Sequence, residues 1–181
     1  MNEDRFTRLT AKVSEAKAGT IKGTALKYNV DVMRGEGLAE RVSPGAFRAQ
    51  LAAPNRVMVL WQHDWDSPIG RGVKLTDSTE ELNFEALITE NVDVPDARRA
   101  LALLREGIVD EISVGFEWGT WHEERDEKKH QLTIVHDKAR LREFSVVTFG
   151  ALGKDARVKS VASQGGLSVA SYRARLAALQ A

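Results

Sequence analysis

The chain has 181 residues, of which 43% are hydrophobic and 29% are charged, a balance typical of a folded domain with a buried core. Its 26 basic and 26 acidic residues cancel, which argues against non-specific binding to nucleic acid, since such binding favours a basic surface. The chain has no cysteine, so disulfides, thiolate catalysis and cysteine-ligated zinc are excluded.

The distribution of apolar residues gives no sign of export or of membrane insertion. The first ten residues, MNEDRFTRLT, are polar and lack the apolar core of a secretory signal. No apolar run approaches the ~20 residues that a membrane-spanning helix needs. We therefore expect the protein to be made and used in a cytoplasm, with neither a membrane nor a nucleic acid as partner.

The first half of the chain predicts mostly strands. Residues 29–42 predict a loop, because Gly35 and Gly37 supply flexibility. Ser43-Pro44 signals the start of a short helix that ends before Pro54. The other elements expected here are an arm or edge strand over 1–18, a strand over 19–28, a buried strand over 56–62, a turn over 64–68, and strands over 69–75 and 82–88.

The second half predicts one clear helix and a long hairpin. Residues 95–106 carry apolar side chains at helical spacing, and Gly107 supplies the stop. The charged run 122–130 fits an exposed hairpin tip. Strands are expected over 108–118, 132–136 and 138–148, followed by an amphipathic helix over 167–181. About seven strands with few crossover helices favour a mainly antiparallel barrel or sandwich with added helices.

A histidine, His63, follows directly on the buried strand predicted over 56–62. A rigid strand would fix its position, and imidazole is the side chain best suited to accept a proton near neutral pH. The alternative is a strand-end histidine that caps a turn with Asp64. Taken alone, the segment favours this structural alternative.

A serine, Ser113, lies in the apolar segment ISVGF. Gly115 would let a substrate backbone approach, and backbone N–H groups near Val114 and Gly115 are one candidate oxyanion hole. The segment is not the G-x-S-x-G elbow of α/β hydrolases, because Glu111 stands where that motif has glycine. The alternative is a serine hydrogen-bonded within a barrel wall, which is the commoner case for an isolated segment.

An acidic residue, Glu143, interrupts the last predicted strand. Strand alternation puts it on the face of Leu141, Ser145 and Val147. A carboxylate on a mostly apolar face needs a partner, and a histidine N–H would serve while fixing the tautomer that activates a serine. The alternative is a surface glutamate paired with a neighbouring arginine.

Together these segments resemble the prohead serine proteases of tailed phages, a family related to the herpesvirus assemblins. The resemblance extends from about residue 19 to residue 161. The segments that carry it are 23–25 (GTA), 40–47 (ERVSPGAF), 60–64 (LWQHD), 68–70 (PIG), Leu82, 104–107 (LREG), 112–116 (ISVGF) and 143–147 (EFSVV). The family usually follows the last segment with Pro-Ala, whereas this chain has Phe149-Gly150-Ala151, which alters a turn after the site.

The resemblance implies a mainly β fold with flanking helices: an assemblin-like (herpesvirus protease-like) barrel of about seven strands. It implies a Ser–His–acid catalytic group without a cofactor, in which Ser113 is the nucleophile and His63 the general base. Glu143 is the preferred orienting acid. Asp64 is the alternative, disfavoured because it adjoins His63 and would point to the other side of the strand.

The three other histidines do not predict a metal site. His122 begins HEERD rather than H-E-x-x-H, and the charge run that contains His122 and His130 fits a solvated hairpin. His136 lies at the end of the next predicted strand. We therefore expect neither a metal nor another cofactor.

The resemblance also implies a serine endopeptidase that cleaves the major capsid protein and a scaffold or delta-domain polypeptide. It would act inside the assembling procapsid, in the host cytoplasm, and could self-associate as assemblins do. The expected organisation is an N-terminal arm over 1–18, a protease barrel over 19–162 and a C-terminal tail or helix over 163–181. That tail could pack on the barrel or on a second copy, or be cleaved by the protease itself.

Two other functions compete with this interpretation. The chain could be a catalytically silent scaffold or capsid-interaction module on the same fold, although such a module has no need of His63, Ser113 and Glu143 together. It could also be a small esterase that uses a similar serine–histidine pair. A serine-reactive phosphonate separates the first from an enzyme, and a panel of peptide and ester substrates separates the second from a protease.

Overall fold

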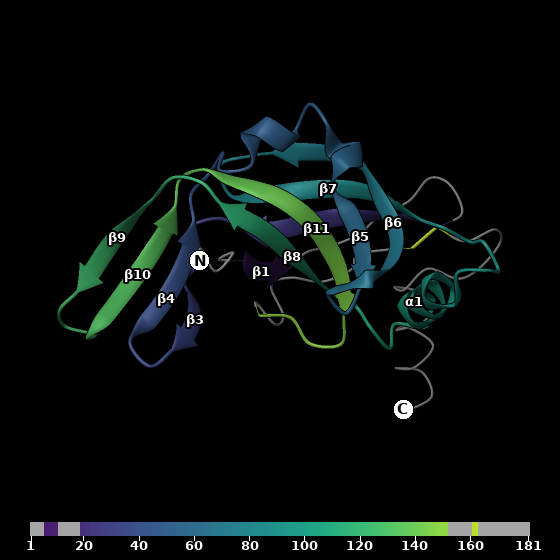
Figure 1. Ribbon diagram of the computed structural model, residues 1–181. Helices are drawn as coiled ribbons and strands as arrows, with labels where there is room; N and C mark the ends of the chain where they lie inside the picture. The colour runs from purple at the N-terminus through teal and green to yellow at the C-terminus, as the bar shows by residue number, and fades with distance from the viewer. Residues whose placement is uncertain (1–5, 11–18, 152–160, 163–181) are drawn as a thin grey trace, which may run out of the picture.

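The computed structural model describes residues 6–10, 19–151 and 161–162, and its architecture is mainly β (Figure 1). A strongly curved seven-stranded sheet forms a half-barrel, and a four-stranded sheet extends from one side. The strands are β1 (Phe6–Thr10), β2 (Thr20–Lys27), β3 (Val32–Gly35), β4 (Leu38–Val42), β5 (Met58–Trp61), β6 (Asp64–Asp77), β7 (Glu81–Ile88), β8 (Glu111–Trp118), β9 (Trp121–Asp126), β10 (Gln131–His136) and β11 (Ala139–Val147). The helix α1 spans Pro95–Arg105, and two short 3-10 helices span Arg48–Gln50 and Pro54–Arg56.

The seven-stranded sheet has the order β1-β8-β11-β5-β6-β7-β2. Its neighbouring strands are antiparallel except β11 and β5, which run parallel. The prediction of a mainly antiparallel, assemblin-like barrel of about seven strands is confirmed by this sheet. The edge strand expected within residues 1–18 is β1, which pairs with β8.

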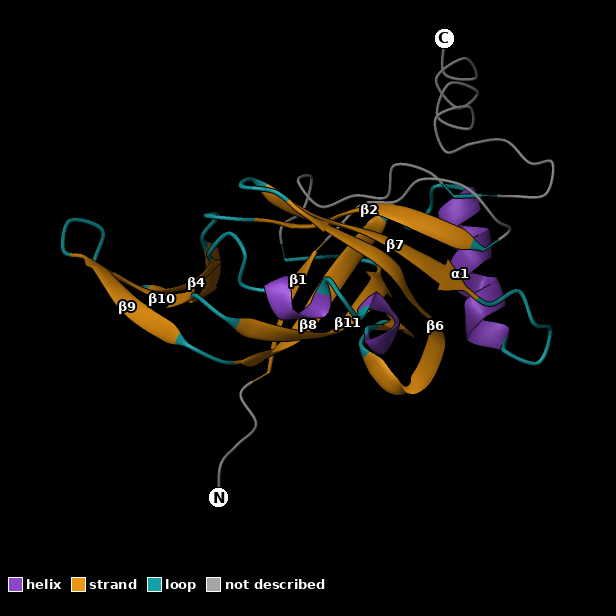
Figure 2. Ribbon diagram, turned by 90° about the horizontal axis from the view of Figure 1, so that it is seen from above, coloured by secondary structure: helices purple, strands orange, loops and turns teal. Residues whose placement is uncertain are grey.

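The concave side of the curved sheet encloses the hydrophobic core. Phe84 and Phe144 stack with ring centroids 4.3 Å apart, and Phe47 meets Phe116 edge to face at 5.4 Å. The helix α1 confirms the predicted helix, and Figure 2 shows it beside the end of the sheet. It packs through one apolar stripe, made of Ala97, Ala100, Leu101 and Leu104. Within the described part of the chain, no helix is long and apolar enough to cross a membrane.

The four-stranded sheet, with the order β3-β4-β10-β9, was only partly predicted. The exposed hairpin expected around 122–130 is present, but most of this run forms the strand β9, and only residues 127–130 make the turn into β10. The loop predicted over 29–42 is wrong, because this segment contains β3 and β4. β4 pairs in parallel with β10, about ninety residues later, and such a long-range pairing leaves no local sequence signal.

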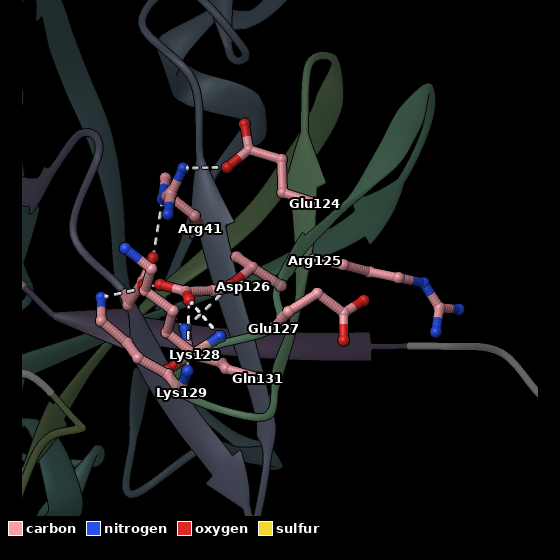
Figure 3. Close-up of a pocket in the computed structure, with 10 residues that line it drawn as sticks. Arg41, Glu124, Arg125, Asp126, Glu127, Lys128, Lys129 and Gln131 are labelled. Atoms are coloured by element: carbon pink, nitrogen blue, oxygen red, sulfur yellow. Dashed lines mark hydrogen bonds and ion pairs between the residues drawn. The ribbon is translucent and has the colours of Figure 1, made fainter.

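Ion pairs hold this second sheet together across its strands. Figure 3 shows Arg41 of β4 reaching the carboxylate of Glu124 on β9, at 2.7 Å. Arg41 also bonds Asp31 at 2.6 Å, and this hydrogen bond lowers the pKa of Asp31. Lys129 pairs with Asp126 at 3.3 Å within the hairpin. Opposite charges on this sheet therefore largely neutralise one another.

Two local predictions are corrected by the structure. The short helix expected after Ser43 is a series of turns followed by the 3-10 helix, because Gly45 adopts a left-handed φ of 80° and Phe47 inserts into the core. The turn expected over 64–68 is the irregular beginning of β6. The helix expected over 167–181 lies outside the described residues.

The stacked pair in the core yields a stability prediction. Phe144→Ala should lower the free energy of unfolding by about 3–5 kcal/mol, because it leaves a cavity against Phe84. Urea unfolding followed by circular dichroism measures this change. The matched control is Phe149→Ala, since Phe149 is 89% exposed and should cost almost nothing. Equal effects of the two variants would contradict the core assignment.

A histidine on the second sheet yields a pH prediction. Nδ1 of His122 lies 2.7 Å from Asp137, and this hydrogen bond, with a smaller contribution from Glu124, raises the pKa of His122. The ion pair therefore stabilises the fold below the ordinary pKa of histidine and is lost as the pH rises through the raised value. NMR titration of His122 should show a midpoint that moves down in Asp137→Asn. An unchanged midpoint would contradict the pair.

Candidate active site

The three residues singled out as catalytic lie on adjacent parts of one sheet. Ser113 belongs to β8, Glu143 belongs to the neighbouring β11, and His63 lies in the turn between β5 and β6. His63 and Ser113 are fifty residues apart in the sequence. Because β8, β11 and β5 are consecutive in the sheet, the strands that carry or lead into these residues are only two strand spacings apart. The sheet thus brings together all three predicted residues.

All three point away from the barrel core. Ile112 and Val114 pack into the core, so the intervening Ser113 faces the opposite side of β8. On β11, Phe144 and Val146 pack into the core, and Glu143 and Ser145 face the opposite side. Residues that pair side by side in a ladder share a face, and Ser145 pairs with Ser113. The candidate site therefore lies on the convex wall of the half-barrel.

The prediction that Glu143 shares a face with Leu141 is wrong. The pairing of β11 with β8 shifts register between Leu141 and Glu143, which marks a β-bulge. A bulge adds one residue to a strand and reverses the alternation that follows it. Leu141 therefore packs into the core, while Glu143 faces the site together with Ser145.

His63 occupies a tight two-residue turn. Trp61 pairs with Asp64, so Gln62 and His63 form the turn, with φ values of 54° and 62°. Positive φ at both positions is the geometry that matches the twist of a hairpin, although it is uncommon for residues other than glycine. Gln62 ties the turn to the end of β11: its backbone N–H donates to Val146 at 2.9 Å and its side chain donates to Thr148 at 2.8 Å.

Hydrogen bonds connect His63 to a buried carboxylate. Nδ1 of His63 lies 2.7 Å from Oε1 of Glu143, whose side chain is fully buried. The Ser145 hydroxyl donates to Oε2 of the same carboxylate at 2.7 Å, and it accepts from the His63 backbone N–H at 3.1 Å. Both carboxylate oxygens are thus bonded, and an N–H at Nδ1 leaves Nε2 of the imidazole to accept a proton.

Ser113 lies on β8, the strand next to the one that carries Glu143 and Ser145. It is directly opposite Ser145 in the antiparallel ladder, which places the two Cα atoms about 4.5–5.5 Å apart. Its side chain is nearly buried, with 3% exposure. A serine hydroxyl, an imidazole and a carboxylate, the three groups used in general-base activation of a nucleophile, therefore lie on neighbouring parts of one sheet.

Asp64, the alternative acid, takes no part in this arrangement. It is exposed, and its Oδ1 accepts a hydrogen bond from the backbone of Asp66 at 2.9 Å. The geometry supports Glu143 as the partner of His63. Strand alternation correctly predicts that Ser145 shares the face of Glu143, but it gives no sign of the two hydrogen bonds by which Ser145 joins Glu143 to the His63 backbone.

The structure argues against the oxyanion hole suggested at Val114 and Gly115. β8 has strands on both sides: Val114 pairs with Leu9 and Phe144, and Gly115 pairs with Arg8 and Glu143. The backbone amides of a central strand are used by its ladders and are not free for a substrate. Donors for an oxyanion would have to come from elsewhere.

The remaining histidines lie apart from this site. His122 bonds Asp137 on the second sheet, and His136 is buried against the rings of Phe116 and Trp118. In the ranges that the structure describes, no three histidine, aspartate or glutamate side chains are grouped to hold a metal ion.

The sequence assigns this chain to a class of viral proteases. The family model for caudovirus prohead serine proteases matches residues 7–167, and the chain belongs to that family. The chain is thus a protease of the phage prohead, the role that its family defines.

A solved structure supports the same architecture. The bacteriophage T4 capsid assembly protease, gp21, is similar with a TM-score of 0.56 and 13% sequence identity, covering 81% of this chain and 99% of that chain. At this identity the similarity shows the fold rather than the details of the site. A search of curated protein sequences finds no match.

The contact between His63 and Glu143 yields a prediction that separates the two candidate acids. Glu143→Gln should slow acylation of Ser113 by a fluorophosphonate about 10³–10⁴-fold, because the amide no longer holds the imidazole in the reactive tautomer. Asp64→Asn is the matched control and should react nearly as fast as the wild type. Labelling is followed by intact-mass spectrometry at equal concentrations of folded protein. A larger loss in Asp64→Asn would overturn the assignment.

Proposed function

We propose that this protein is a serine endopeptidase that works through an acyl-enzyme intermediate. The observation that carries the proposal is the 2.7 Å contact between His63 and the buried Glu143, with Ser113 on the next strand. Burying a carboxylate lowers the stability of a fold, so a purely structural role does not explain Glu143 well. A carboxylate bonded to an imidazole close to a serine is, in contrast, useful for catalysis. Membership of a serine protease family points the same way.

In the proposed mechanism each residue has a separate task. Glu143 accepts the Nδ1–H of His63 and stabilises the imidazolium as it forms. Nε2 of His63 takes the proton of the Ser113 hydroxyl, whose oxygen attacks the peptide carbonyl and forms a tetrahedral intermediate. His63 then protonates the leaving amine, and water hydrolyses the acyl-enzyme by the same route in reverse. Ser145 positions both His63 and Glu143 by its two hydrogen bonds.

The proposed substrates are the major capsid protein and a scaffold or delta-domain polypeptide of an assembling procapsid in the host cytoplasm. Support comes from the prohead assignment of the family and from the capsid assembly role in the name of the T4 relative. Self-cleavage within 163–181 is one alternative for this segment, and packing on the barrel or on a second copy are the others. We propose that activity depends on self-association, which concentration inside the shell would favour.

The decisive prediction concerns Ser113. Co-expression of the wild type with the neighbouring capsid protein should yield cleaved capsid protein or a shortened protease, and Ser113→Ala should yield neither. Loss of a nucleophile lowers the rate ~10⁴–10⁶-fold, so Ser113→Ala should give no detectable product during the hours of co-expression. Intact-mass spectrometry identifies the products and the cut site.

The matched control is Ser78→Ala, in the exposed turn between β6 and β7, which should cleave like the wild type. Circular dichroism establishes that each variant is folded. Cleavage that persists in Ser113→Ala would overturn the proposed nucleophile. Absence of cleavage in the wild type, combined with no labelling of Ser113 by a fluorophosphonate, would favour a silent scaffold module.

A further inference from the structure

An exposed apolar patch lies beside the candidate catalytic residues. Met58 is 36% exposed and Trp65 is 48% exposed. Both line a hollow of about 340 Å³. Met58 also lines a second hollow of about 670 Å³, together with Pro68 and Leu87. Large apolar side chains that remain in water on the same surface commonly mark a binding site.

The patch is continuous with the candidate active site. Met58 pairs with Glu143 in the parallel ladder between β5 and β11, so the two side chains share the convex face. Trp65 follows His63 by two residues. Strand spacing and rise place Met58 about 12 Å from Ser113, a distance that three or four residues of extended peptide cover.

The rim of the patch is basic. Arg56, Arg140 and Arg142 line the first hollow, and Arg71 lines the second. Glu90 is the one carboxylate lining either hollow among the described residues, and it pairs with Arg105. The chain as a whole is neutral, so four arginines around one apolar patch form a local excess of positive charge.

Two of these arginines are available for a ligand. Arg140 and Arg142 both pair with Glu117, at 3.8 and 3.2 Å. Arg56 and Arg71 are exposed, and they form no ion pair with the residues that the structure describes. The charged pocket of Figure 3 differs in this respect, because both of its arginines are already paired: Arg41 with Asp31 and Glu124, and Arg125 with Glu123.

We propose that this patch, called here the Met58 surface (Met58, Trp65 and Pro68 with Arg56, Arg71, Arg140 and Arg142), binds an extended acidic segment of the protein substrate. The inference rests on the proposed endopeptidase function and adds a substrate class to it. A large apolar side chain of the substrate packs against Met58 and Trp65, and an aspartate or glutamate a few residues from the scissile bond meets Arg56 or Arg71. An acidic peptide complements the charge of the arginines, and the patch is continuous with the candidate active site, so a substrate segment is the ligand that fits it best.

The test is a cleavage profile on a peptide library prepared from a whole proteome, with cut sites identified by mass spectrometry. Wild-type enzyme should enrich acidic and large apolar residues within about four positions of the cut, because three or four residues of extended peptide cover the distance from Ser113 to Met58. Arg56→Glu/Arg71→Glu should reverse the charge preference towards lysine and arginine. Met58→Ala/Trp65→Ala should abolish the apolar preference.

Two matched controls should keep the wild-type profile: Arg98→Glu on the exposed side of α1, and Val73→Ala, an exposed residue of β6 outside the patch. On the best acidic peptide, Arg71→Gln should lower kcat/KM about fivefold, as expected for one exposed charge contact. Raising the salt concentration should reduce this difference, because exposed charges are screened.

Labelling of Ser113 by a fluorophosphonate separates the two hypotheses, since a small probe does not reach the Met58 surface. Every variant should be labelled at the wild-type rate while its peptide profile changes. Normal labelling with an unchanged profile in the arginine and Met58/Trp65 variants would overturn the proposed surface alone. Failure of the wild type to label or to cleave would overturn the endopeptidase function and the surface together.

Discussion

The position of β11 between β8 and β5 is the constraint on which the site depends. The antiparallel ladder with β8 places Ser145 opposite Ser113. The parallel ladder with β5 places the end of that strand, and with it His63, beside Glu143. One bulge after Leu141 then turns Glu143 out of the core and towards the imidazole. A different register in either ladder would move the serine or the histidine to another face, because side chains alternate at every residue.

The buried carboxylate of Glu143 is stabilised here because each of its two oxygens accepts a hydrogen bond. Glu143 is fully buried, yet its two oxygens are bonded by His63 and Ser145, and the Ser145 oxygen is in turn bonded by the His63 backbone. This closed arrangement fixes the imidazole at a turn whose positive φ values are otherwise unfavourable. Pre-organisation of this kind is what acid–base catalysis needs, since no group has to be reoriented during the reaction.

The same sheet connects chemistry to recognition. Met58 and Glu143 are ladder partners, so the strand that positions the histidine also carries the apolar centre of the proposed substrate surface. Catalytic and binding residues on rigid strands keep their spacing, whereas the second sheet, β3-β4-β10-β9, neutralises its own charges and extends away from this face. The half-barrel thus has one convex face for substrate and one concave face for the core.

The sequence by itself predicted the class of fold, the helix α1 and most strands, because apolar periodicity is a local property. It singled out His63, Ser113 and Glu143 as candidates only through the joint resemblance of several short motifs to the prohead proteases. It missed β3 and β4, whose pairing with β10 joins segments about ninety residues apart. Glu143 is also predicted on the face of Leu141, because the prediction assumes that side chains alternate strictly along the strand and does not detect the bulge between the two residues. Only the tertiary structure decided which acid meets His63, since Asp64 is nearer in sequence but the ladder between β5 and β11 brings Glu143 to the ring.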